Sequence, residues 1–566
     1  MTQAATVQNA APEASNTKDM KDIVALCKRR GFIFPASDIY GGINGFWDYG
    51  PLGVELKNNL RDLWWKHMVL TPPLGPKGTA YEGQPVDIVG LDSSIIQNPK
   101  AWVASGHVGG FSDPMQTCRQ CQRHIRADHI DDMLKESEWV KSFAENFEET
   151  EHNNFIKFSS VKALKWAHNK GKKLAPGLAL VRNPQITISW LAEDLKKSRE
   201  QDGFEEPMAL ETVLSYMATE QKAKTGLQKP CPHCGGDLTE PRQFNLMFES
   251  YTGVLRDDSS RVYLRPETAQ GIFLNFKNVL DSSRVRVPFG IAQIGKAFRN
   301  EVNPRNFIFR SREFEQMEME WFCHPDEAKI WRDFWFQERQ KFWRAIGLRS
   351  DNLRMRDHDS DELSHYAKAG LGTADIEYRF PFTAPDFGEL EGISHRCDFD
   401  LTQHQEHSKV KMEYTDPVTQ EKFMPHVIEP AAGLTRGVLA LLTEAYTPDP
   451  NRPSGVYLDF HPSVAPKKAA ILPLTAKDEH PILATRLYME LREHYNVDLD
   501  IKQNIGKRYA RQDEIGTPFC FTIDDQTVQD KTVTVRHRNT MKQDRISMDS
   551  VVEYMQKNSL LATGRE

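Results

Sequence analysis

The sequence of 566 residues contains no run of eighteen apolar residues, the length that a helix needs to cross a bilayer, so we expect no membrane span. The first residues, Met1 to Asn16, lack the basic start and apolar core of a signal peptide, and they predict a disordered tail in a cytoplasmic protein. An excess of positive charge is also missing, because the net charge is −7. Any contact with nucleic acid must therefore use local basic surface.

Cysteine is scarce, with eight in the chain, and four of them form two Cys-x-x-Cys pairs. Two such pairs in a cytosolic protein indicate a structural zinc site with four thiolate ligands, rather than disulfides. The ligands would be Cys118, Cys121, Cys231 and Cys234. This interpretation requires residues 122–230 to be an insertion that leaves the site and returns. The alternative is one redox pair and one coincidental pair.

Arginines, glutamates and aromatics are concentrated in residues 298–322. Arg299 and Glu301 are two apart, so on a strand they would point the same way. Pro304 and Asn306 suit a hairpin loop before the return strand. Such a hairpin could hold a polyanion with a flat base and a small cation, which describes ATP and an amino acid. The alternative is a solvated hairpin with ordinary surface charge.

Phe298-Arg299-Asn300-Glu301, Arg310 to Phe314, and Gly433 to Arg436 at the start of an apolar helical pattern occur in this order. They resemble motifs 2 and 3 of the class II aminoacyl-tRNA synthetases. Further segments resemble the single-chain, homodimeric type of glycyl-tRNA synthetase, over nearly the whole chain from Asp22 to Lys557. These segments are Gly31 to Pro35, Trp47 to Gly53, and Arg265 to Phe273.

The resemblance implies an α+β catalytic domain on a mostly antiparallel sheet, with a zinc-knuckle and helical insertion and a C-terminal α/β anticodon-binding domain. The disordered tail would be residues 1–18, and the first part of the catalytic core, with the dimer-interface motif, residues 19–117. The insertion would be residues 118–242, the second part of the core 243–462, and the anticodon-binding domain 463–566. The implied partners are ATP, glycine, tRNA(Gly) and a second copy of the chain.

The resemblance also implies roles for residues that bind ATP. Arg299 would bridge the carboxylate of glycine and the α-phosphate, because a planar guanidinium can bond to both anions. Glu301 would lie near the adenine amino group or the tRNA end, and Arg310 would hold the outer phosphates. Adenine would lie between the ring of Phe314 and the guanidinium of Arg436, and the carboxylate of Glu389 would hold Mg²⁺ with ATP. Leu390 and Arg396 would lie beside these residues.

Glu267 and Glu318 match family positions that hold the ammonium group of glycine. Ala431 stands where many members of the family have a serine that helps to bind glycine. Synthetases for threonine, proline or histidine are one alternative, and a catalytically inactive relative that binds nucleic acid is another. The retained Arg299, Arg310 and Arg436 argue against the second.

Local patterns predict helices over 19–30 and 53–69, strands over 284–287 and 289–294, and a loop over 105–111 that contains a loop histidine, His107. After residue 467, strands and helices alternate. The expected strands are 469–474, 497–501, 519–523 and 532–538, and the expected helices are 480–494 and one containing 508–514. The basic and aromatic residues of 506–518 suit contact with RNA.

Overall fold

The structure is a computed structural model that describes residues 18–130, 133, 231–234, 238–360, 362–364, 367–383, 386–476 and 479–559. The chain divides into two compact units, Met1–His107 with Met247–Glu566, and Val108–Leu246. Nearly all of the predicted disordered tail and most of the predicted insertion lie outside the described residues.

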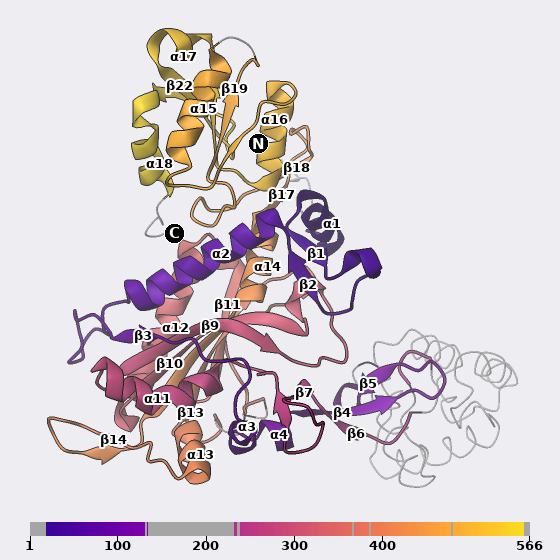
Figure 1. The fold of residues 1–566 in the computed structure, drawn as a ribbon, viewed down its shortest axis with the longest axis vertical. Helices are drawn as coiled ribbons and strands as arrows, with labels where there is room; N and C mark the ends of the chain where they lie inside the picture. The colour runs from indigo at the N-terminus through magenta and orange to yellow at the C-terminus, as the bar shows by residue number, and fades with distance from the viewer. Residues whose placement is uncertain are drawn as a thin grey trace, which may run out of the picture. The chain divides into compact units, whose positions relative to one another are not determined.

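A seven-stranded sheet forms the centre of the larger unit (Figure 1), in the order β11-β12-β13-β16-β10-β9-β3. All neighbouring strands are antiparallel except β3 and β9, which confirms the expected mostly antiparallel sheet. β9 and β10 form the predicted hairpin, with Phe298 opposite Glu313. The strands are β3 (Ile88–Gly90), β9 (Phe289–Phe298), β10 (Glu313–Cys323), β11 (Leu353–Asp357), β12 (Thr373–Tyr378), β13 (Gly388–Cys397) and β16 (His426–Gly433).

Alternation along β10 separates two apolar cores. Met317, Met319 and Trp321 belong to the core that also contains residues of α2, α12 and α14, whereas Phe322 packs with residues of α11. Because side chains on a strand point alternately to opposite faces, Phe314, Gln316 and Glu318 share the face of Phe322. The helices on these faces are α2 (Pro51–Trp65), α11 (Ala269–Ser283), α12 (Ala328–Ala345), α13 (Phe399–Ser408) and α14 (Leu434–Ala445).

Residues Leu56, Leu60 and Trp64 recur every four positions on α2 and are buried together, as expected for an amphipathic helix. The predicted helix over 53–69 therefore exists, but it begins at Pro51 and continues as a π-helical turn, Lys66–Leu70. The other elements of this part of the chain are α1 (Met20–Arg30), β1 (Ile33–Pro35), β2 (Trp47–Tyr49), α3 (Pro99–Ala104), α4 (His107–Gly110), β7 (Glu249–Tyr251), β8 (Arg261–Tyr263), β14 (Tyr414–Thr415), β15 (Lys422–Phe423), β17 (Tyr446–Pro448) and β18 (Val456–Leu458).

The C-terminal residues form a five-stranded sheet in the order β20-β19-β21-β22-β23. β20, β19 and β21 are parallel, and β22 and β23 are antiparallel. This confirms the predicted α/β unit, although α17, β23 and α18 were not predicted. The elements are β19 (Ala469–Pro473), α15 (His480–Leu491), β20 (Val497–Leu499), α16 (Ile505–Ile515), β21 (Phe519–Ile523), α17 (Asp525–Asp530), β22 (Thr532–His537), β23 (Gln543–Ser547) and α18 (Val551–Ser559).

The smaller unit contains a three-stranded sheet in the order β5-β4-β6. β4 (Ser112–Thr117) and β5 (His124–Arg126) come from its start, and β6 (Arg242–Asn245) comes from its end. The two edges of the predicted insertion therefore meet in one sheet.

Two local predictions were wrong. Residues 284–287 form no strand, because α11 ends at Ser283 and Arg284 adopts a left-handed conformation with φ 55°. The predicted loop over 105–111 contains the short helical turn α4. Among the described residues, no helix has both the length and the apolar character of a membrane span.

Candidate active site

The floor of the site consists of alternate residues on neighbouring strands of the central sheet. These residues all face the side of α11, because the residues between them enter the opposite core. They enclose a cavity of about 430 Å³. The floor residues are Phe314, Gln316 and Glu318 of β10, Thr373 and Asp375 of β12, Gly392, Ser394 and Arg396 of β13, and Glu429, Ala431 and Gly433 of β16.

Nine residues that the sequence predicted for ATP or glycine line this cavity. They are Glu267, Arg299, Glu301, Arg310, Phe314, Glu318, Glu389, Arg396 and Arg436. Leu390 does not line it, because its side chain is 1% exposed within the apolar core, so any contact of Leu390 with ATP must use its backbone.

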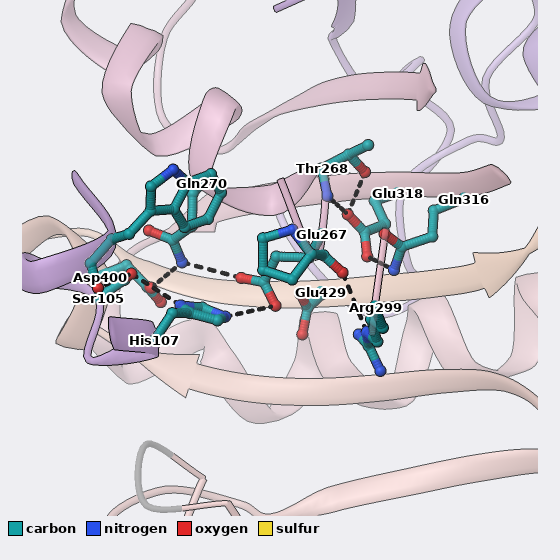
Figure 2. A network of polar contacts seen from close by, with 12 residues as sticks. Ser105, His107, Glu267, Thr268, Gln270, Arg299, Gln316, Glu318, Asp400 and Glu429 are labelled. Carbon is teal, nitrogen blue, oxygen red and sulfur yellow. Dashed lines mark hydrogen bonds and ion pairs between the residues drawn. The ribbon is translucent and has the colours of Figure 1, made fainter. Parts of the chain in front are cut away.

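Glu318 is held at the centre of the site by three donors (Figure 2). Its Oε2 accepts hydrogen bonds from the backbone N of Thr268 at 3.1 Å and from the Thr268 hydroxyl, and its Oε1 accepts one from Gln316 Nε2 at 2.6 Å. Burial, together with the charge of Glu267, raises the pKa of Glu318 to about 7. The carboxyl of Glu318 is therefore about half protonated near pH 7.

Glu267 differs from Glu318 in its ionisation. Burial opposes the charge of this carboxyl, but His107, Arg396 and Gln270 outweigh burial and hold its pKa well below the usual range. Its Oε2 lies 3.4 Å from His107 Nε2, and its Oε1 accepts a hydrogen bond from Gln270 Nε2 at 3.1 Å. Glu267 is therefore a fixed negative charge that faces the cavity.

Glu429 is a further acid of the cavity that the sequence analysis did not assign. Arg396 donates to both oxygens of Glu429, at 3.0 and 3.1 Å, and to both oxygens of Asp400. Burial and the charges of Glu318 and Glu267 nevertheless raise the pKa of Glu429 to about 8, against the effect of Arg396. The available signal was its place in the sequence, two residues before Ala431.

Acids outnumber the cations that hold them at this end of the cavity. Glu320 lies next to Glu429 across the strands and is fully buried, and burial first, then Glu429, raises its pKa well above the ordinary value. Glu320 does not line the cavity, whereas Glu267, Glu318 and Glu429 do, and a small cation that enters the cavity would favour the ionised forms of these three acids.

The arginines predicted to bind phosphate lie beyond the strand ends rather than on the strands. β9 ends at Phe298, so Arg299 and Glu301 belong to the connecting loop, and Arg310 precedes β10. The loop uses Asn306 in a left-handed conformation, φ 59°, as its sequence suggested. Arg299 Nε donates to the backbone O of Pro266 at 3.1 Å, and the guanidinium lies 5.4 Å from the centre of the Phe314 ring.

Another predicted phosphate ligand of the cavity, Arg436, lies in the first turn of α14, whose N-cap residue is Gly433. Its guanidinium lies 4.5 Å from the centre of the Phe309 ring and 2.9 Å from the Oε2 of Glu389. The positive charge of Arg436 lowers the pKa of Glu389, although burial opposes this. A guanidinium and a carboxylate that can bind a hard cation therefore lie together, as a triphosphate with Mg²⁺ requires.

His358 and Asp375 also line the cavity, and the sequence analysis missed both. His358 Nε2 lies 2.7 Å from Asp375 Oδ2. Burial and the neighbouring Glu389 raise the pKa of Asp375 to about 6, against the effect of His358. Asp375 is thus a second acid that can respond to a cation at Glu389.

The four cysteines predicted to bind zinc meet in the smaller unit. The Sγ atoms of Cys118 and Cys234 are 3.5 Å apart, those of Cys121 and Cys231 are 3.7 Å apart, and all four lie within 4.8 Å of one another. Zn–S bonds of about 2.3 Å in a tetrahedron require sulfur atoms about 3.8 Å apart. The four thiols therefore fit a zinc ion, and the alternative of one redox pair does not explain why both pairs converge.

The segment 506–518 was interpreted as an RNA-contact segment, and its central residues are structural. Arg508 is 2% exposed and donates to the backbone O of Pro473 and of Asp500. Tyr509 bonds to Thr522 and lies under Arg536. The local sequence did not reveal that Arg508 and Tyr509 are buried, because basic and aromatic residues at a helix start give the same composition in an exposed helix and in a buried one.

Two family models match the chain. The model described as "tRNA synthetase class II core domain (G, H, P, S and T)" matches residues 248–446, and the model described as "Anticodon binding domain" matches residues 468–558. A prolyl-tRNA synthetase structure from Cryptosporidium parvum, complexed with halofuginone and AMPPNP, has a TM-score of 0.53 and 12% identity. The alignment covers 97% of this chain and 79% of that one, which shows a shared fold.

Curated relatives match along almost the whole chain. A glycine–tRNA ligase from Rhodopirellula baltica is 44% identical over 579 residues, covering 96% of this chain and 100% of that protein. The ligase from Alkaliphilus oremlandii is 44% identical over 544 residues, covering 95% and 98%, and that from Cutibacterium acnes is 42% identical over 549 residues, covering 96% of each. The chain therefore belongs to the glycine–tRNA ligase family of class II tRNA synthetases.

Proposed function

We propose that this chain activates glycine with ATP to glycyl-adenylate and transfers the glycyl group to the 3′ end of tRNA(Gly), using the cavity described above. The observation that carries the proposal is the distribution of charge in this cavity. Glu267, Glu318 and Glu429 gather at one end, and Arg310 and Arg436 line the same cavity. Such a cavity suits an ammonium group beside a polyphosphate.

In the first step, a carboxylate oxygen of glycine bonds to the α-phosphorus of ATP, and the bond to the departing pyrophosphate breaks. Both reactants are anionic, so a fixed cation between them lowers the barrier. Arg299 would supply that cation, because it lines the cavity and the backbone O of Pro266 fixes its guanidinium. Glu267 and Glu318 would hold the ammonium, and Phe314 would stack on adenine. In the second step a tRNA hydroxyl attacks the carbonyl carbon and AMP leaves.

Two metal ions have residues that fit them. Glu389 would hold Mg²⁺ that arrives with ATP, with Asp375 nearby, and this ion would neutralise charge on the phosphates. Zn²⁺ would be bound by the four thiolates of Cys118, Cys121, Cys231 and Cys234 and would stabilise the smaller unit.

We further propose a homodimer in the cytoplasm, with the five-part domain division expected from the sequence. Ile39 and Tyr40, on a short turn between β1 and β2, are 89% and 86% exposed, and adjacent large apolar side chains with this exposure favour a partner surface. Tyr40→Asp should shift the sedimentation coefficient from that of a dimer towards that of a monomer. The two Cys-x-x-Cys pairs, which would hold zinc as thiolates, suit a reducing compartment.

The test is exchange of pyrophosphate into ATP that depends on the amino acid, with glycine, alanine, serine, threonine and proline compared side by side. We expect exchange with glycine alone, and Arg299→Ala should reduce it at least about 100-fold while the protein stays folded. Exchange with threonine or proline instead would point to another class II specificity. Absence of exchange with every amino acid would favour a catalytically inactive relative.

A further inference from the structure

His107, which the sequence analysis interpreted as a loop histidine, lies beside Glu267 (Figure 2). Its Nε2 is 3.4 Å from Glu267 Oε2, and its Nδ1 is 2.8 Å from the hydroxyl oxygen of Ser105. The ring meets that of Trp102 edge to face, with centroids 5.5 Å apart. The side chains of His107 and Glu267 are only 12% and 15% exposed, so the contact is largely screened from water.

Together, His107 at the start of α4 and Gln270 of α11 hold the two oxygens of Glu267. Gln270 Nε2 bonds to Glu267 Oε1 at 3.1 Å and to Asp400 Oδ1 at 2.9 Å, so Gln270 is itself fixed. A carboxylate offers about four lone-pair directions, and these contacts occupy one on each oxygen. The carboxylate plane of Glu267 is thereby set, and the remaining directions are left for a donor in the cavity.

The contacts of His107 also favour one arrangement of its proton. If the Ser105 hydroxyl donates to Nδ1, the ring carries a hydrogen on Nε2 and donates it to Glu267. A hydrogen on Nε2 lets the ring orient the carboxylate of Glu267 towards the cavity. The contact between His107 and Glu267 can shorten when a ligand draws Glu267 into place.

We propose that His107 is a positioning residue for glycine, which acts by orienting the carboxylate of Glu267 towards the ammonium group. This inference rests on the proposed function and adds to it a residue, 160 positions before Glu267 in the sequence, that determines affinity for the amino acid. His107 acts through Glu267, so its loss should affect glycine and leave ATP unaffected.

Two substitutions separate orientation from packing. His107→Leu keeps an apolar side chain of similar size against Trp102 but removes the donor. His107→Gln places an amide donor near the position of Nε2. A hydrogen bond to a charged group predicts that His107→Leu raises the KM for glycine in pyrophosphate exchange between about 10-fold and 100-fold. The KM for ATP should stay within about twofold, and His107→Gln should restore most of the glycine affinity.

Ser105→Ala is a milder variant, which removes only the partner of Nδ1 and should raise the KM for glycine between about twofold and tenfold. His324→Leu is the matched control, because His324 contacts Asp326 and Glu421 outside the cavity. Both KM values of the control should equal those of the unchanged protein. Thermal unfolding of each variant shows whether it is folded.

Equal losses in His107→Leu and His107→Gln, a parallel rise in both KM values, or an unchanged KM for glycine in a folded His107→Leu would overturn the inference. Failure of His107→Leu to fold would leave the decision to Ser105→Ala and His107→Gln. Absence of glycine-dependent exchange in the unchanged protein would refute the proposed function, and this inference with it, before any variant is compared.

Discussion

Glycine should bind more weakly as the pH falls from 8 to 6, because two carboxyls of the site gain protons over this range. Burial raises the pKa of Glu318 to about 7 and that of Glu429 to about 8, and neighbouring carboxylates add to both shifts. The ammonium of glycine pairs with a carboxylate and not with a neutral acid. Glu267 is already ionised throughout this range, so the pH dependence arises because the ammonium also pairs with Glu318, which must then lose its proton.

The size of the effect follows from these pKa values. A group with a pKa of about 7, as for Glu318, is about 90% ionised at pH 8 and about 10% ionised at pH 6. Release of one proton thus predicts that the KM for glycine rises about tenfold between these pH values. If Glu429, with a pKa of about 8, must also lose its proton, the KM for glycine rises by roughly several hundredfold between pH 8 and pH 6.

The assay is glycine-dependent pyrophosphate exchange at saturating ATP and Mg²⁺ between pH 6 and pH 8, with the KM for ATP measured as the control. Glu318→Gln should raise the KM for glycine at pH 8 and flatten its dependence on pH. A KM for glycine that stays constant, or that falls at low pH, would refute the reasoning.

Low pH weakens the binding of glycine, but in the ligand-free chain Glu318 stabilises the folded state at low pH. A pKa raised from 4.5 to about 7 means that the folded chain keeps a proton that the unfolded chain has lost. This contribution to stability is present below about pH 4.5 and disappears as the pH rises through about 7.

Other predictions concern single groups. Arg299→Lys keeps the charge but loses the planar fork, so exchange should fall at least about tenfold. Glu389→Gln should increase the Mg²⁺ concentration that gives half-maximal exchange, as a Mg²⁺ titration would show. Glu391→Gln breaks a fully buried pair with Arg339 and should cost about 3–5 kcal/mol, which a lower unfolding temperature would reveal. Cys234→Ser should reduce bound zinc below one ion per chain, measured by elemental analysis.

The sequence predicted the hairpin, but its placement of Arg299 and Glu301 on a strand was wrong, because β9 ends at Phe298. Period-two alternation sets Phe314 and Glu318 on one face, and the hairpin follows from Pro304 and Asn306. Nine of the residues predicted from the motifs line one cavity. The family resemblance supplied their roles, which composition and periodicity alone do not reveal.

The remaining features depend on contacts between distant segments. His107 lies in a glycine-containing segment with no periodic pattern, and only the fold brings it to Glu267. Arg536 and Arg538 lie in the expected strand over 532–538, and both are buried, where they bond to Asp513 and Asp459. Charge in a sequence favours an exposed interpretation, and burial of paired charges overrides it.

The most direct measurement is a crystal structure with a stable glycyl-adenylate analogue, such as glycyl-sulfamoyl adenosine. We predict that the ammonium of the analogue lies within hydrogen-bond distance of Glu267 and Glu318, and that Arg299 contacts the group that replaces the phosphate. An analogue bound with its ammonium away from both glutamates, or with Arg299 turned out of the cavity, would contradict the account.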